Sequence, residues 1–233
     1  MKIIIIIIIV TIIIIYNIMY SDQKIYDIHH LSYPVNFTKK IISKDPKMYY
    51  LENIITDYEA NYFIDLAEKY KTDSILARDH TKLVDIKYRT SSTAYLEKGM
   101  NKKVKIIEER IASLLNVNYK KIEPLQIVIY EKDQYFKPHL DTFYENSIEL
   151  QQGGNRTHTI LIYLNDIDEE SGGKTIFTKL NMKFQPKKGN AIYFQNMING
   201  KIDNRLMHEG ESLYNLTKKY IINIWIREEE FWN

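Results

Sequence analysis

Cysteine is absent from this 233-residue chain. Its absence excludes disulfide bonds, thiolate nucleophiles, zinc fingers and iron–sulfur clusters, so any metal site must use other side chains. The absence of cysteine does not indicate a cellular compartment, because a cysteine-free chain works in any redox environment. An excess of one charge is also missing, since 32 Lys and Arg face 30 Asp and Glu and the formal net charge is +2. No basic face or stripe stands out, and we expect no nucleic-acid partner.

One long apolar run stands apart at the amino terminus. Ile3 to Ile15 is interrupted only by Thr11, and the run continues to Tyr20, about the length that spans a bilayer core. We expect residues 1–20 to be an uncleaved transmembrane signal anchor, with Lys2 cytoplasmic and the domain lumenal, as in the endoplasmic reticulum, or extracellular. A cleaved signal peptide is the rival interpretation, but no Ala-x-Ala-like site follows. The many β-branched residues argue against a buried core helix.

The remaining chain divides into a connector and one domain. Residues 21–45 are polar, of mixed charge and without a clear period, which predicts a linker. Residues 46–233 have the size of one ordinary domain. One helix is expected after Thr56 and Glu59, which have capping-box spacing, and a second over residues 101–115, which carry a single apolar stripe.

After Pro124 the pattern changes to short runs rich in β-branched and aromatic residues, separated by turn clusters. Helices followed by many short strands predict an α+β chain that ends in a β-sandwich or barrel of jelly-roll type. The expected strands are Leu125–Tyr130, Thr157–Leu164, Thr175–Phe177, Asn190–Phe194 and Tyr220–Ile226.

A candidate metal site consists of His139 and Asp141, two positions apart, and the distant His208. Residues i and i+2 of a strand point to the same face, so an imidazole and a carboxylate can bind one ion together. Two histidines with one carboxylate leave open positions on the metal and are typical of non-heme Fe(II) oxygenases. His-x-Asp alone is a weak signal, so the surrounding sequence decides. The other histidines are interpreted as ordinary core or surface residues: His29, His30, His80 and His158.

The segments around these residues occur in a recognisable order. From Arg89-Thr90-Ser91-Ser92 to Trp225 the chain resembles the prolyl 4-hydroxylase family of 2-oxoglutarate- and Fe(II)-dependent dioxygenases. The likeness is greatest to the short, stand-alone forms of algae and large DNA viruses, and it covers well over half of the chain. The segments that carry it are Leu125–Tyr130, His139–Asp141, Arg156–Asn165, Gly172–Phe177, Pro186–Phe194, Asp203–Gly210 and Lys219–Trp225.

The resemblance implies both a fold and a reaction. The fold is a double-stranded β-helix, or jelly roll, supported by N-terminal helices. The reaction is hydroxylation of peptidyl proline at C4, as in procollagen-proline 4-dioxygenases, with decarboxylation of 2-oxoglutarate to succinate. Fe(II) would be held by His139, Asp141 and His208, O2 would be the oxidant, and L-ascorbate would rescue oxidised enzyme. The expected partners are a proline-containing peptide or protein and, through residues 1–20, a membrane.

The resemblance also requires a buried cation for the far carboxylate of 2-oxoglutarate, since an unpaired charge in a closed barrel is costly. Two lysines compete for this role. Lys218 lies ten residues after His208, whereas Lys219 lies six before Trp225 and shares its strand parity with Asn223. The parity favours Lys219.

Further residues receive roles by the same matching. Tyr130 and Thr175 would donate hydrogen bonds to the cosubstrate. The peptide channel would be lined by Arg156, Trp225 and Arg89, although Trp225 fits core packing equally well. Tyr163 is interpreted as a core residue. It would gain a cosubstrate role if the chain were closer to the oxygen-sensing branch of the family.

Three positions depart from the family pattern: Asp133 stands for Gly, Phe136 for Tyr and Ser212 for Pro. Phe136 removes a phenol donor near the substrate, which Tyr135 could partly replace. Two other functions therefore stay open, the same oxygenase chemistry on a protein lysine or small molecule and a non-catalytic membrane-anchored binding protein. An intact ligand set with its lysine argues against the second. A metallohydrolase would want an acid/base carboxylate near the metal and would leave the lysine without a purpose.

Overall fold

The structure is a computed structural model that describes residues 36–73 and 88–232. The predicted anchor, residues 1–20, lies outside the described residues, as do His29, His30 and His80. Within the described ranges, no helix has the length and apolar character needed to cross a membrane.

An eight-stranded sheet forms the larger layer of the described chain. All of its neighbouring strands are antiparallel. Strands from both ends of the domain alternate in it, an order typical of jelly rolls rather than of simple meanders. The order is β1 (Thr38–Ser43), β2 (Met48–Glu52), β10 (Ala191–Gln195), β7 (Arg156–Tyr163), β14 (Lys219–Arg227), β5 (Leu125–Tyr130), β4 (Ser92–Leu96) and β3 (Thr72–Asp73).

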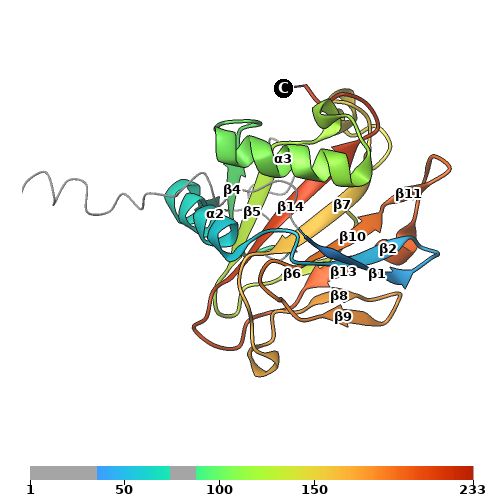
Figure 1. Cartoon of the computed structure of the whole chain (residues 1–233). Helices are drawn as coiled ribbons and strands as arrows, with labels where there is room; N and C mark the ends of the chain where they lie inside the picture. The colour runs from blue at the N-terminus through green and yellow to red at the C-terminus, as the bar shows by residue number, and fades with distance from the viewer. Residues whose placement is uncertain (1–35, 74–87, 233) are drawn as a thin grey trace, which may run out of the picture. The chain divides into compact units, whose positions relative to one another are not determined.

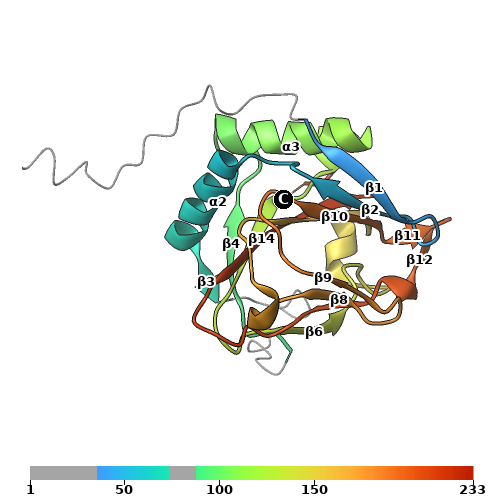
Figure 2. The same cartoon turned by 60° about the horizontal axis from the view of Figure 1, so that its bottom comes forward.

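A second, four-stranded antiparallel sheet packs on one face of the first. Val128 and Leu161 of the large sheet and Phe177 of the small one belong to one buried cluster between the two. Figure 2 shows the small sheet on one side of the large sheet and the helices on the other. Its order is β6 (Phe136–His139), β13 (His208–Gly210), β8 (Thr175–Phe177) and β9 (Met182–Phe184), and a separate hairpin pairs β11 (Met197–Ile198) with β12 (Lys201–Ile202).

Two helices, α2 (Asp57–Tyr70) and α3 (Lys102–Leu115), cover the other face of the large sheet (Figure 1). The two-residue period of β5 directs Ile127 and Ile129 into the core beneath the helices, whereas Val128 and Tyr130 face the small sheet. Short 3-10 helices connect the elements: η2 (Tyr119–Lys121), η3 (Ile148–Gln151), η4 (Glu169–Ser171) and η5 (Asn204–Leu206).

Helix capping follows the sequence pattern. The Glu59 backbone N–H donates to the Thr56 hydroxyl at 3.2 Å, and the Glu59 carboxylate accepts from the Thr56 N–H at 2.8 Å. Asn101 caps α3 by accepting from the N–H groups of Lys103 and Val104. Because these caps satisfy backbone donors that the helix cannot use, they fix where each helix begins.

The five predicted strands and both predicted helices are present, with ends within one residue of the expected positions where a range was predicted. One expectation was wrong. Residues 38–43, placed in the linker, form β1, which pairs with β2. An exposed edge strand needs no buried face, and β1 therefore carries no apolar alternation that a sequence could reveal.

A buried ion pair joins α2 to α3. The Arg110 Nη2 lies 2.7 Å from the Glu59 Oε1, and the two side chains are 4% and 0% exposed. Arg110→Met should lower the free energy of unfolding by about 3 kcal/mol, because it leaves the Glu59 carboxylate buried without its cation. Urea unfolding measures the change. Lys105→Met is the control, since its pair with Glu109 at 3.6 Å is exposed and should contribute little.

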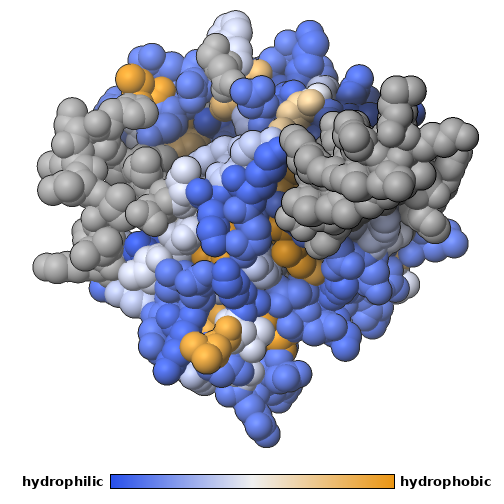
Figure 3. Space-filling model, turned by 90° about the vertical axis from the view of Figure 1, so that its left-hand side faces the viewer, coloured by the Kyte–Doolittle hydropathy of each residue, from blue (hydrophilic) through white to orange (hydrophobic). Residues whose placement is uncertain are grey.

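The molecular surface agrees with this layering. The face drawn in Figure 3 is largely hydrophilic, and hydrophobic residues show on it as small separate spots. Apolar side chains thus gather between the layers rather than on this face.

Candidate metal centre

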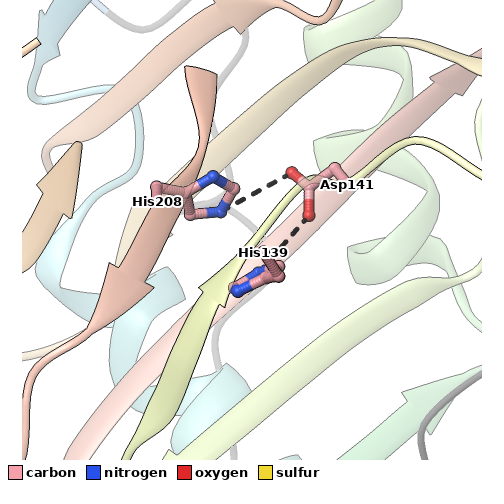
Figure 4. Close-up of side chains that lie close together, drawn as sticks. All are labelled: His139, Asp141 and His208. Carbon is pink, nitrogen blue, oxygen red and sulfur yellow. Dashed lines mark ion pairs between the residues drawn. The ribbon is translucent and has the colours of Figure 1, made fainter. Parts of the chain in front are cut away.

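His139, Asp141 and His208 come together between the two sheets (Figure 4). His139 ends β6, His208 begins β13, and the two are direct partners in the antiparallel register. Asp141 lies in the loop that follows β6 rather than within the strand. His139 and Asp141 still point to the same side, as expected for residues two positions apart, but at the end of the strand. His139 Nε2 lies 3.8 Å from Asp141 Oδ1, and His208 Nε2 lies 3.9 Å from Asp141 Oδ2.

Both imidazoles are oriented through their second nitrogen. His139 Nδ1 lies 2.8 Å from the Lys137 carbonyl oxygen, and His208 Nδ1 lies 3.0 Å from that of Leu206. A carbonyl oxygen only accepts hydrogen bonds, so Nδ1 carries the proton in each ring and Nε2 keeps a free lone pair. Backbone acceptors of this kind commonly orient metal-binding histidines. The ligand atoms of the three residues lie within 4.8 Å of one another, a donor set that fits Fe(II).

Electrostatics keep the donors in their metal-binding forms. Burial, together with His208, lowers the pKa of His139 to about 3, so its ring is neutral. Burial raises the pKa of Asp141, but the histidines, Arg156 and a hydrogen bond from Thr159 outweigh it and hold this pKa below its ordinary value. The Nε2 atoms of His139 and His208 and the Asp141 carboxylate thus face the same space.

Thr159 of β7 supports Asp141 from behind. Its hydroxyl donates to Asp141 Oδ2 at 2.7 Å and accepts from the Asn196 amide at 2.9 Å. Thr159→Val keeps the shape and removes this bond, so we expect Fe(II) affinity to fall about tenfold. Titration with Fe(II) under anaerobic conditions measures it. Thr157→Val is the matched control, because Thr157 donates to the Ile226 carbonyl instead. Equal Fe(II) affinity of the two variants would exclude this role of Thr159.

Lys219 lies at the other end of the space between the sheets. It is 1% exposed, its Nζ donates to the Gly173 carbonyl oxygen at 2.7 Å, and it lies 5.0 Å from the centre of the Tyr130 ring. Burial lowers the pKa of Lys219 to about 7. A buried ammonium group without a paired carboxylate is costly, and an anionic ligand would offset that cost.

Lys218 points elsewhere. Its Nζ lies 3.1 Å from Glu68 and 2.9 Å from Glu131, and its side chain is 36% exposed. Successive residues of a strand face opposite sides, so only one of the two lysines can enter the space between the sheets. The position of Lys218 therefore agrees with the choice of Lys219 over Lys218, and the cosubstrate role of Lys219 stays a prediction.

Tyr130 and Thr175 both lie near this end. Tyr130 is the register partner of Lys219, and Thr175 is that of Gly210. A Cβ on Gly210 would lie 3.0 Å from the Tyr130 hydroxyl, so a larger residue there would push the Tyr130 side chain by a few tenths of an ångström. Tyr163, predicted as a core residue, is fully buried, and its hydroxyl donates to Thr175 Oγ1 at 2.9 Å. Its phenol is therefore close to the predicted cosubstrate residues as well as part of the core.

Arg156 and Trp225 stack on each other beside the three candidate ligands. The Arg156 Cζ lies 3.5 Å from the centre of the Trp225 ring, and its Nη1 donates to the Asp141 carbonyl oxygen at 3.3 Å. Glu123 holds the guanidinium through two bonds, at 2.7 and 2.8 Å. Such a two-bond pair fixes the plane of the guanidinium as well as its position.

Arg89 lies near His139 through the Phe136 ring. Its Nε donates to Ser91 at 2.8 Å and its Nη2 to Thr93 at 3.0 Å. Its guanidinium lies 4.8 Å from the centre of the Phe136 ring, and that ring stacks on His139 at 3.5 Å. Phe136, which lacks the hydroxyl of the family tyrosine, is therefore packed between an arginine and a metal ligand.

The sequence did not predict two residues of this site, Thr159 and Glu123. Thr159 sits inside an apolar strand, and threonine is common in strands for packing reasons alone. Glu123 precedes Pro124 as an ordinary charged residue before a strand. Thr159 meets Asp141 across 18 positions of the chain and Glu123 meets Arg156 across 33, so no local spacing could have revealed these contacts.

Comparisons with known proteins agree with this geometry. The 2OG-Fe(II) oxygenase superfamily model matches residues 125–227. A protein of Acanthamoeba polyphaga mimivirus that is named as a prolyl 4-hydroxylase is 33% identical over 191 residues, which cover 79% of this chain and 76% of the viral protein. The protein named Probable prolyl 4-hydroxylase 3 of Arabidopsis thaliana is 32% identical over 178 residues, and the match covers 68% of this chain but 61% of that relative's length.

Solved structures bear on the fold. The viral collagen prolyl hydroxylase of Paramecium bursaria Chlorella virus-1, in its 2OG complex, aligns with a TM-score of 0.61 and 23% identity, covering 77% of this chain and 95% of that chain. A likeness at this identity concerns the fold alone. The predicted double-stranded β-helix core with supporting helices is confirmed by it and by the two facing sheets.

Proposed function

Because this chain belongs to the prolyl 4-hydroxylase family of 2OG-Fe(II) oxygenases, we propose that it hydroxylates peptidyl proline at C4. The hydroxylation would be coupled to decarboxylation of 2-oxoglutarate to succinate, with O2 as the oxidant and L-ascorbate as the reductant. One observation supports the proposal most directly. His139, Asp141 and His208 converge with both imidazole Nδ1 atoms bound to backbone carbonyls, in the same space that the buried Lys219 enters.

The two ends of this space suit different parts of one reaction. His139, Asp141 and His208 would hold Fe(II), which when bound supplies open coordination positions for the cosubstrate and O2. Lys219 would pair with the far carboxylate of 2-oxoglutarate. Tyr130 and Thr175 would donate hydroxyl hydrogen bonds to it, and the buried walls contributed by the two sheets would exclude water. The protein thus contributes orientation and a dry site.

The substrate side is assigned to Arg156, Trp225 and Arg89. Arg156 lies against the backbone of the metal ligand Asp141 and over the Trp225 ring, so a peptide that contacts Arg156 brings its neighbouring residues to the metal.

Peptide-stimulated turnover tests the proposal. The full chain, purified in detergent with Fe(II), 2-oxoglutarate and ascorbate, should release succinate faster when a proline-rich or collagen-like peptide is added. Turnover that no peptide stimulates would instead favour the same chemistry on a small molecule. Stimulation by a lysine peptide that contains no proline would favour hydroxylation of protein lysine. Iron binding without any turnover would favour a binding protein.

The localisation is part of the proposal. The apolar run from Ile3 to Tyr20 supports a single membrane-spanning anchor with the domain on the lumenal or extracellular side. In expressing cells, the full chain should resist extraction from membranes by alkaline carbonate, and its domain should be protected from added protease in sealed microsomes. Removal of residues 1–20 should abolish both properties. Alkaline extraction of the full chain would contradict the anchor.

A further inference from the structure

Guanidinium groups outnumber carboxylates on the substrate side of the metal centre. Arg156 and Arg227 both pair with Glu123, at 2.7 and 2.5 Å, and all three side chains are buried or nearly so, at 13%, 2% and 8% exposure. Arg227 Nη1 also donates to the Glu149 backbone carbonyl at 3.1 Å, the charge of Glu149 acts on the pKa of Arg227, and the Glu228 carboxylate accepts from the Asn155 N–H. One buried carboxylate is thus shared by two arginines, and Arg156 is the one that reaches the metal ligands.

Arg89 adds a third buried cation. It contacts the hydroxyls of Ser91 and Thr93 and the Phe136 ring, and no carboxylate of the described residues lies within ion-pair distance of it. Arginine stays charged even when buried. Arg156 and Asp141 both lie close enough to Arg89 for their charges to act on its pKa, so these groups share one electrostatic environment.

An unused donor faces the same region. Trp225 is 5% exposed, and its Nε1 has no hydrogen-bond partner within the described chain. The residue lies opposite Thr159, whose hydroxyl binds Asp141, so the indole is next to the metal ligands. Buried donors are almost always satisfied, and one without a partner beside a reaction site indicates a ligand acceptor.

The cosubstrate side does not use this surplus. With Fe(II) and 2-oxoglutarate bound, the charges of the metal and of Lys219 are matched by Asp141 and the two carboxylates of 2-oxoglutarate. Among the described residues, Glu123 is then the carboxylate that pairs with Arg156 and Arg227, and no carboxylate forms an ion pair with Arg89. Since buried positive charges produce a positive electrostatic potential at the site, they favour an anionic ligand there.

We propose that the peptide substrate carries an Asp or Glu within about two residues of the target proline, and that this carboxylate is bound by Arg156 and the field of Arg89. The proposal rests on the proposed function and narrows its substrate class to acidic proline-containing sequences. The Trp225 Nε1–H would donate to the same carboxylate or to an adjacent peptide carbonyl.

Matched peptides test the proposal through binding. Three synthetic peptides differ only in whether Glu, Gln or Lys flanks one proline, and their Kd values are measured anaerobically with Fe(II) and 2-oxoglutarate, so that no turnover occurs. The Glu peptide should bind about tenfold more tightly than the Gln peptide, and the Lys peptide more weakly than both. At about 0.5 M salt the difference should shrink to two- or threefold.

Variants identify the cation. Arg89→Gln should reduce the preference for Glu over Gln to about threefold or less, whereas Arg89→Lys, which keeps the charge, should retain it. Lys40→Gln removes an exposed cation of β1 and should leave the preference unchanged. Equal Kd values for the Glu and Gln peptides would overturn the proposal. An undiminished preference in Arg89→Gln would overturn the part assigned to Arg89.

The two proposals fail differently. Equal hydroxylation and equal binding of all three peptides would leave prolyl hydroxylation standing and remove the charge preference. Absence of hydroxylation in every peptide, with tight binding of the Glu peptide and of its alanine-for-proline version, would contradict prolyl hydroxylation and support the anionic subsite.

Discussion

His139→Ala should reduce Fe(II) affinity by more than about 100-fold and bring 2-oxoglutarate turnover to background. The variant loses one of three protein ligands and leaves Asp141 and His208 unable to surround the ion. The ligand atoms of the three residues lie within 4.8 Å of one another, so each of them can reach the same ion. Losing an orienting hydrogen bond already costs about tenfold, and losing the ligand itself should cost more. Anaerobic Fe(II) titration and succinate release measure both effects.

His158→Ala is the matched control. His158 also lies on β7, but on the face away from the candidate ligands. Its ring stacks on that of Tyr193, with 5.9 Å between the ring centres. Its loss should affect stability and leave Fe(II) affinity unchanged. Retention of iron-dependent turnover in His139→Ala would contradict the assignment of the metal centre.

The second large effect concerns Lys219. Lys219→Met keeps the length of the side chain and removes its charge, so we expect KM for 2-oxoglutarate to rise about 100-fold. That factor corresponds to roughly 2.7 kcal/mol, a reasonable contribution for one buried charge-assisted hydrogen bond. The lowered pKa of Lys219, caused by burial, indicates that its charge is held at a cost that a bound carboxylate would offset.

The neighbouring lysine provides an internal control. Lys218→Met removes the same functional group one residue away, where it contacts Glu68 and Glu131 at the surface. KM for 2-oxoglutarate should remain within about twofold of the parent, because exposed ion pairs contribute little. Steady-state succinate release at varied 2-oxoglutarate measures both variants. An unchanged KM in Lys219→Met, or a larger rise in Lys218→Met, would contradict the assignment.

Much of this fold is legible in the sequence. The capping pair Thr56 and Glu59 fixes the start of α2, and the uniform apolar runs of β5 and β14 predict buried central strands. What failed was β1, because an exposed edge strand leaves no periodic signal. Strand order was also beyond reach, since pairs such as β2 with β10 join residues that lie far apart in the chain.

The candidate site was predictable to the extent that ligand chemistry is local. The spacing of His139 and Asp141 indicated a ligand pair, and strand parity favoured Lys219 over Lys218. The supporting residues could not be predicted from the sequence. Thr159, Glu123 and Asn196 reach the site only through sheet pairing and loop packing. The local excess of buried arginines over carboxylates could not be predicted either, because the whole chain has nearly equal numbers of positive and negative side chains.

The most direct test of the account is mass spectrometry of the peptide after turnover. With Fe(II), 2-oxoglutarate and ascorbate, a proline-containing acidic peptide should gain one oxygen atom, located by fragmentation on proline, and chromatography against standards should identify 4-hydroxyproline. Succinate should form in a one-to-one ratio with the product. Succinate formed with a peptide whose proline stays unmodified, or an oxygen found on another residue, would contradict prolyl 4-hydroxylation by this chain.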